Sequence, residues 1–140
     1  MSYDLERFVR AQIGSYETAL WEIRRGRKCS HWMWYIFPQI AGLGMSSTAQ
    51  YYAIQDLQEA EEYLAHPILG PRLLEISGEL LKLSTNDAYA VFGWPDDLKL
   101  RSSMTLFAAV SPEGSVFHRV LDKYYGGIPD DLTLSLLHLC

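Results

Sequence analysis

Apolar residues recur along most of this chain with the period of an α-helix. The clearest run lies between Leu69 and Leu83, where apolar residues are spaced alternately four and three apart and therefore share one helix face. Asp56 followed by Glu59 has the form of a helix-capping box, and Gly126 has the position of a helix stop. The sequence contains no run of β-branched residues with period two. The pattern therefore predicts helices nearly throughout.

The size and composition of the chain are typical of one globular domain. It has 140 residues, of which 49% are apolar and 21% are charged, so it can bury a core of its own. Frequent helix breakers, among them Gly14, Pro38 and Pro67, exclude the long helices of a four-helix bundle. We expect a single all-α domain over residues 1–140, with seven or eight short helices in an irregular, roughly orthogonal array.

Charge and cysteine usage limit the location and the partners. Charged residues within the first ten positions leave no room for the apolar stretch of a signal peptide. Residues 29–55 lack charge, but polar residues and glycines interrupt this segment, so no run of about 20 apolar residues could span a membrane. Cys29 and Cys140 do not make a disulfide framework. We expect a cytoplasmic protein, and its net charge of −5 disfavours binding to duplex DNA.

The first candidate functional segment is residues 28–39, where a lysine, a histidine and several aromatic residues occur together. Residues 35–37 are best explained as core, because aromatic side chains bury large apolar areas. His31 lies beside Trp32 and downstream of a cation, which suits the lip of a pocket. A hydrogen bond from His31 to a backbone carbonyl explains the same residue equally well.

The second candidate is the basic segment that ends at Lys28. Four of the twelve basic residues lie between Arg24 and Lys28, and the first 28 residues hold six of the twelve basic but only four of the seventeen acidic residues. The dipole of a helix favours cations at its C-terminus by about 0.3–1 kcal/mol each, which explains Arg24 and Arg25 without a ligand. Lys28 follows the helix stop at Gly26, so a site for phosphate, a nucleotide or an acidic protein segment remains open there.

The third candidate is residues 99–107, which have the spacing of a helix with one buried stripe. Ser102, Ser103 and Thr105 are small enough to permit close helix packing, and this explanation needs no ligand. Lys99 and Ser103 are four apart, which also fits a nucleophile with its base, although such pairs are common by chance. Lys99 could instead bind an anion.

Signals for metals and cofactors are weak. The pairs Cys29–His31 and His138–Cys140 do not match the ligand spacing of known zinc motifs. The sequence contains neither a glycine-rich phosphate loop nor a nucleophile elbow. We expect no metal and no cofactor. The lack of a catalytic motif favours a non-catalytic protein but leaves the question of an enzyme open.

Two strings are specific enough to indicate a family. They are His-Trp-Met-Trp at residues 31–34 and Lys-Leu-x-Ser-Ser-Met-Thr-Leu-Phe at residues 99–107. Together with matching strings at residues 8–12 and 59–73, they resemble the domain-of-unknown-function 1810 family over about residues 5–137. The resemblance implies a compact all-α domain with no accepted activity. The polar residues of the family's motifs correspond here to Gln12, Lys28, His31, Gln39, Lys99, Ser102, Ser103 and Thr105.

The family is also loosely labelled calpastatin. A calpain inhibitor of that kind is expected to be disordered, whereas this chain has the composition of a folded domain. The label therefore implies nothing physical about this protein.

Three functions fit these observations. The first is a non-catalytic, chaperone-like module that binds a protein segment and exposes an apolar patch for it. The second is an enzyme or sensor for a nucleotide or other phosphate ligand. The third, binding of single-stranded nucleic acid, is disfavoured by the net charge. We expect the partner to be a protein or a small anionic ligand, not duplex nucleic acid or a membrane, and the chain to be a monomer or a weak dimer.

The candidate ligand-binding residues are Gln12, Lys28, His31, Trp32, Trp34, Gln39, Lys99, Ser102, Ser103 and Thr105. In the nucleotide hypothesis the cations bind the anion, a tryptophan stacks on the base, and His31 or a hydroxyl is the only candidate base or nucleophile. This hypothesis requires that residues 28–39 and 99–105 converge on one pocket.

Overall fold

The computed structural model describes residues 3–139, and in that part of the chain it contains ten helices and no strand. The helices are α1 (Glu6–Gln12), α2 (Ser15–Arg24), α3 (Met33–Ile36), α4 (Ser47–Tyr51), α5 (Leu57–Ala65), α6 (Leu69–Leu81), α7 (Ala88–Phe92), α8 (Asp96–Ala108), α9 (Val116–Tyr125) and α10 (Asp131–Leu136). The all-α prediction is confirmed. The count exceeds the seven or eight expected, and three of the helices, α3, α4 and α7, have only four or five residues.

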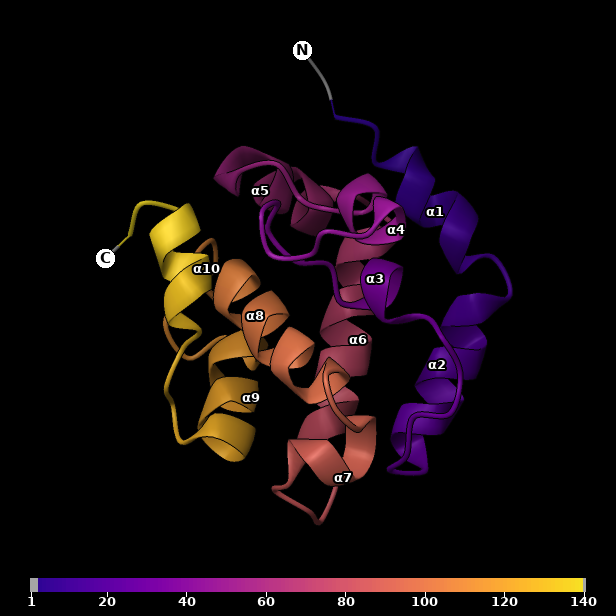
Figure 1. The fold of residues 1–140 in the computed structure, drawn as a ribbon. Coiled ribbons are helices and arrows are strands. Elements are labelled where there is room, and N and C mark those ends of the chain that lie inside the picture. The colour runs from indigo at the N-terminus through magenta and orange to yellow at the C-terminus, as the bar shows by residue number, and fades with distance from the viewer. Residues whose placement is uncertain (1–2, 140) are drawn as a thin grey trace.

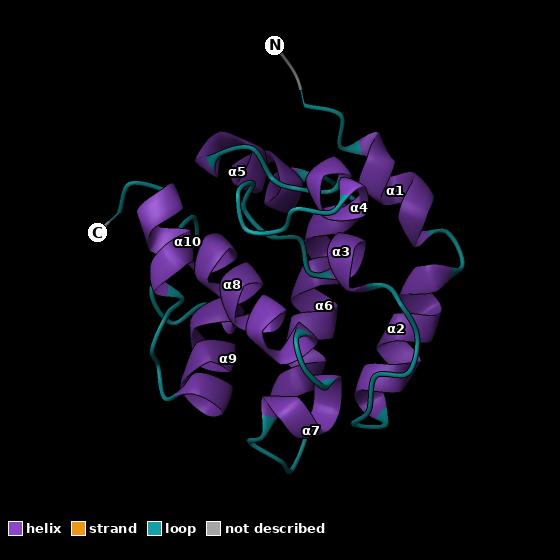
Figure 2. Ribbon diagram, in the orientation of Figure 1, coloured by secondary structure: helices purple, strands orange, loops and turns teal. Residues whose placement is uncertain are grey.

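Helix α6 occupies the middle of the fold, as Figure 1 shows, with α1 and α2 on one side and α8, α9 and α10 on the other. It packs against α2, α5 and α9, while α8 packs against α7, α9 and α10. The helices run in several directions and do not form a parallel bundle (Figure 2). Among residues 3–139, no helix has both the length and the apolar character needed to cross a membrane.

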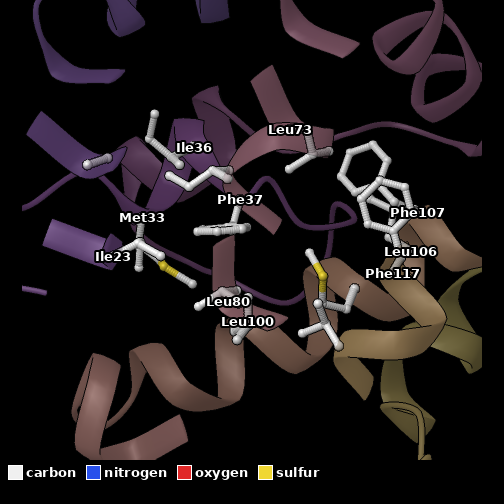
Figure 3. Packing of buried hydrophobic residues seen from close by; sticks show 14 of the residues in the cluster. Ile23, Met33, Ile36, Phe37, Leu73, Leu80, Leu100, Leu106, Phe107 and Phe117 are labelled. Carbon is white, nitrogen blue, oxygen red and sulfur yellow. The ribbon is translucent and has the colours of Figure 1, made fainter. Parts of the chain in front are cut away.

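The buried apolar residues form one cluster that draws on both ends of the chain. Phe37 lies within it among side chains from α2, α6 and α8 (Figure 3). The ring of Phe37 packs against those of Trp32 and Phe92. Its centroid is 6.1 Å from that of Trp32, in a tilted arrangement, and 5.9 Å from that of Phe92, in an edge-to-face arrangement. The aromatic segment at residues 32–37 is therefore largely core, as its composition indicates.

Buried polar groups join α1 to the segments beside it. The guanidinium of Arg7 donates hydrogen bonds to the backbone carbonyls of Asp4, Tyr51 and Ala53, and it lies 3.0 Å from the buried carboxylate of Glu59. These contacts satisfy a cation whose side chain is only 8% exposed. They fix the start of the chain against α4 and α5.

The predicted capping box at α5 forms with one change. The carboxylate of Asp56 accepts a hydrogen bond from the backbone N–H of Glu59 at 2.9 Å, as expected. The carboxylate of Glu59 bonds to the N–H of Gln55 at 2.7 Å, one residue before the cap. Glu59 also pairs with Arg7, so its position serves the core as well as the cap.

Candidate functional site

A buried carboxylate fixes the loop that leads into the aromatic segment. Glu22 of α2 is 3% exposed and accepts hydrogen bonds from the backbone N–H groups of Cys29 (2.7 Å) and Ser30 (3.0 Å). It also accepts bonds from the Ser30 hydroxyl (2.6 Å) and the Trp32 indole N–H (2.9 Å). Burial alone would raise the pKa of Glu22, but these four donors outweigh burial and lower the pKa to about 2.

Lys28 is enclosed by partners within the protein. Its Nζ donates to the carbonyl of Ser30 at 2.6 Å, lies 2.8 Å from Oδ2 of Asp96 and sits 5.0 Å from the centre of the Trp32 ring. The Lys28 side chain is 8% exposed, and Trp32 is 1% exposed. The structure therefore gives both residues internal partners, and Trp32 presents no face on which a base could stack.

Asp96 links the two predicted segments. Its Oδ2 pairs with Lys28, and its Oδ1 lies 3.7 Å from Nζ of Lys99. Residues 28 and 99 thus approach the same carboxylate from different parts of the chain. His31 makes none of these contacts, because it is exposed on its loop and forms no side-chain hydrogen bond with the described residues.

A cleft of about 430 Å³ lies where the loop after α3 meets α4, α8 and the start of α10. Figure 1 labels these helices. Four of the ten predicted site residues line it, and they come from both predicted segments. The lining residues are Trp34, Gln39, Leu43, Gly44, Met45, Ser46, Ala49, Pro95, Leu98, Lys99, Ser102, Asp130 and Leu132. The cleft has a volume typical of ligand sites, with mainly apolar walls and a few polar groups.

Three polar groups of the cleft lack a hydrogen-bond partner among residues 3–139. They are the indole N–H of Trp34, the side-chain amide of Gln39 and the ammonium of Lys99. Lys99 is 28% exposed and lies 5.4 Å from the centre of the Trp34 ring. Its contact with Asp96, at 3.7 Å, is longer than a hydrogen bond. These groups are available to a ligand without breaking a strong internal contact.

The acidic residue of the cleft lining, Asp130, is held by hydrogen bonds within the protein. Oδ2 of Asp130 accepts hydrogen bonds from the Ser102 hydroxyl (3.2 Å) and from the backbone N–H (3.0 Å) and hydroxyl (2.5 Å) of Thr133. Asp130 thereby caps α10 and holds it against α8. Ser102 lines the cleft, but its hydroxyl is used by Asp130 and by the carbonyl of Leu98.

The remaining hydroxyls of this segment are core groups. Thr105 is 2% exposed, donates to the carbonyl of Arg101 at 2.8 Å and accepts from the N–H of Asp130 at 2.9 Å. Ser103 is fully buried, and its hydroxyl has no partner among the described residues. Both residues lie outside the cleft lining, as the close-packing explanation requires.

Gln12 also lies in the core and away from the cleft. It is 2% exposed, and its amide N–H₂ donates to the carbonyl of Tyr35 (2.9 Å) and the hydroxyl of Tyr63 (3.2 Å). Its carbonyl oxygen accepts from Arg72 at 3.2 Å. Gln12 therefore connects α1 to α3, α5 and α6.

Sequence reasoning missed three kinds of residue. Asp96 and Asp130 belong to none of the candidate segments, and only the fold shows that Asp96 lies beside the two lysines and that Asp130 lines the cleft. Met45 and the loop around it contain no chemical motif. Glu22 could have been found, because it is a carboxylate on the helix face that also holds Ala19 and Ile23.

Neither of the two serines that line the cleft is hydrogen-bonded to a histidine or a lysine of the described residues. Ser102 donates to the carboxylate of Asp130 and to the carbonyl of Leu98, and the hydroxyl oxygen of Ser46 accepts from the N–H of Ala49 as the cap of α4. A serine–histidine pair does occur at Ser115 and His118, 2.7 Å apart, but this pair caps α9 outside the cleft. Within residues 3–139, no group of three or more His, Cys, Asp or Glu side chains is placed to hold a metal ion.

Comparison with known proteins gives the family. The sequence pattern described as "Protein of unknown function (DUF1810)" matches residues 2–137. The crystal structure of the conserved hypothetical protein Rv1873 from Mycobacterium tuberculosis is similar, with a TM-score of 0.95, 48% sequence identity and 99% of each chain covered. No curated protein matches the chain. Because the match spans nearly its whole length, the chain belongs to the DUF1810 family of proteins of unknown function.

Proposed function

We propose that this protein is a non-catalytic binding module that takes an apolar protein segment into the cleft beside Trp34. The observation that carries the proposal is the exposure of large apolar side chains at the cleft. Met45 is 79% exposed, Leu98 is 50% exposed and Leu132 is 57% exposed, and all three line it. Apolar side chains grouped around a concave site are typical of surfaces that bind other proteins.

The alternative is a nucleotide- or phosphate-binding enzyme or sensor. Lys99 next to the ring of Trp34 favours it, since this pair could bind a phosphate and stack on a base. The surrounding charge opposes it. Asp130 lines the cleft and Asp96 lies behind Lys99, while Lys28 is enclosed by its own partners. A polyphosphate would therefore meet two carboxylates and one available cation.

A matched pair of surface variants tests the proposal. Leu132→Asp places a charge in the cleft, whereas Leu74→Asp places one at a similarly exposed site on α6 (49% exposed) that does not line it. Peptides selected on the wild-type protein from a random library should bind Leu132→Asp at least tenfold more weakly and Leu74→Asp with unchanged affinity. The proposal would be contradicted if the selected peptides bound Leu132→Asp as tightly as the wild type, or if the library yielded no binding peptide.

Thermal melts with nucleotides, ADP-ribose and sugar phosphates test the alternative. A ligand at 100 times its dissociation constant stabilises the folded state by about 2.7 kcal/mol, which raises Tm by several degrees at this size. A rise that disappears in Lys99→Met would favour the phosphate ligand over the protein segment.

A further inference from the structure

We infer that the cleft receives the C-terminal residue of a polypeptide, with its α-carboxylate at Lys99 and its apolar side chain against Trp34 and Leu98. This inference rests on the proposed function and specifies which part of a protein segment the cleft takes. It follows from three features of the site: the hydrogen-bond donors, the balance of charge and the size of the apolar walls.

The donors call for a ligand rich in acceptors. The free polar groups are the Trp34 indole N–H, which only donates, the Lys99 ammonium, which only donates, and the Gln39 amide, which does both. A carboxylate has two oxygens that only accept, so it can satisfy several of these donors at once. A peptide group from the middle of a chain has only one oxygen to accept from these donors, whereas a carboxylate has two. A backbone N–H of the ligand could donate to Gln39 or to Oδ1 of Asp130, which none of the described hydrogen bonds uses.

The charges around the cleft favour a ligand with one negative charge over a ligand with two. Lys99 is the one cation in the cleft lining, and its 3.7 Å contact with Asp96 leaves its ammonium free to form shorter bonds. Asp130 lies in the same lining. A monocarboxylate can pair with Lys99 and add no second charge, whereas a phosphate dianion would bring an extra negative charge towards Asp96 and Asp130.

The apolar walls and the volume fit the end of a chain. Leu43, Ala49, Pro95 and Leu98 border the same cavity as Lys99, so one ligand can contact both kinds of group. The volume of about 430 Å³ is near the lower end for ligand sites. It suits about two residues and not a long segment, while the exposed side chains of Met45 and Leu132 provide contacts for residues before the last one.

Paired peptides provide the test. Tetrapeptides Ac-Ala-Gly-Ala-X, in which X is each amino acid in turn, would be titrated as free acids and as C-terminal amides. The readout is the ¹H–¹⁵N signal of the Trp34 indole, identified by its loss in Trp34→Phe. Acids with X as Leu, Ile, Met or Phe should shift this signal and bind about tenfold or more tightly than their amides, since a charge-assisted hydrogen bond is lost.

Lysine variants separate the carboxylate contact from general packing. Lys99→Met should reduce the affinity of the acids to that of the amides, and Lys99→Arg should keep the preference for acids. Lys82→Met is the matched control, because Lys82, at the C-cap of α6, is 73% exposed and does not line the cleft. It should leave both affinities unchanged.

The outcomes distinguish this inference from the proposed function. Equal binding of acids and amides at Trp34 would overturn the carboxylate contact and leave binding of a protein segment intact. Tighter binding of phenyl phosphate, or equal binding of N-acetylphenylalanine without a peptide chain, would overturn the chain terminus as the occupant. If no tetrapeptide shifts the Trp34 signal while library peptides bind at Leu132, the inference fails alone; if neither binds, the proposed function fails too.

Discussion

Glu22 keeps its charge inside the protein because four donors from one short loop surround its carboxylate. Two of these donors are backbone N–H groups, which only a substitution to proline would remove. The loop from Cys29 to Trp32 therefore has its conformation set by a residue of the preceding helix. This explains how an exposed, glycine-free loop can place Trp32 in the core and Trp34 at the cleft.

The depressed pKa of Glu22 predicts a loss of stability in acid. Its folded-state pKa of about 2 lies below the ordinary 4.5, so its contribution is complete above about pH 4.5 and is lost as the pH falls towards 2. The shift corresponds to at most about 3 kcal/mol. In urea unfolding, Glu22→Gln should be less stable than wild type at pH 7, and the difference should shrink below pH 4.5. A difference that does not change with pH would contradict this account.

Part of the site could be predicted at the level of residues. Trp34, Gln39, Lys99 and Ser102 were expected to act together, and they line one cleft. Gln12, Lys28 and Trp32 are the same types of residue as Gln39, Lys99 and Trp34. Their polar groups, however, are already bonded to other groups of the protein. The partners come from residues distant in the chain or from the far side of a helix. Spacing along a sequence cannot show that a polar group is already satisfied.

Among the elements, α6 shows how much of a helix its sequence determines. Its regular apolar spacing predicted the helix, and Leu69, Leu73, Ile76 and Leu80 are buried as expected. The helices α3 and α4 have only four and five residues, too few to be stable alone. They depend on packing and on local bonds, such as the cap that Ser46 provides for α4 at 3.1 Å. Periodicity along the sequence is a weak guide to helices of this length, because tertiary packing decides whether they form.

Two glycines of α6 predict opposite effects of the same substitution. A Cβ at Gly70 would lie 2.1 Å from the carbonyl oxygen of Leu64 in α5, a backbone atom that cannot move away alone. A Cβ at Gly78 would meet nothing within 4 Å. Gly70→Ala should lower the free energy of unfolding by about 3 kcal/mol. Gly78→Ala should raise it by about 0.5–1 kcal/mol, because alanine favours helix.

Denaturant unfolding of both variants against the wild type measures these changes. The contrast rests on α5 and α6 being packed closely at Gly70, so equal effects of the two substitutions would show that this contact is looser than described.

Across the whole molecule, the early and late parts of the chain are joined at Asp96. Lys28 belongs to the loop after α2, while Asp96 and Lys99 belong to α8. The sequence predicted an all-α domain from periodicity, but the way that distant segments meet could not be predicted because it depends on tertiary packing. The two ion pairs of Asp96 are unequal, since Lys28 is close and buried while Lys99 is more distant and more exposed.

This inequality predicts different roles for the two lysines. Lys28→Met should lower the free energy of unfolding by about 2 kcal/mol without any ligand, because it leaves Asp96 and the Ser30 carbonyl without their buried donor. Lys99→Met should change it by less than about 0.5 kcal/mol, since a partly exposed pair at 3.7 Å contributes little. Thermal and urea unfolding measure both changes, and equal losses would contradict the conclusion that Lys28 contributes more to stability than Lys99.

Because Lys28 and Lys99 share the carboxylate of Asp96, a change at one lysine affects the ion pair of the other. A ligand that drew Lys99 into the cleft would leave Asp96 to Lys28 alone, and that pair would strengthen. A ligand in the cleft would then stabilise the loop that follows Lys28 and carries the exposed residues Cys29 and His31. Thermodynamic reciprocity requires the converse, so any partner that engaged this loop and altered Lys28 would change the affinity of the cleft by the same factor.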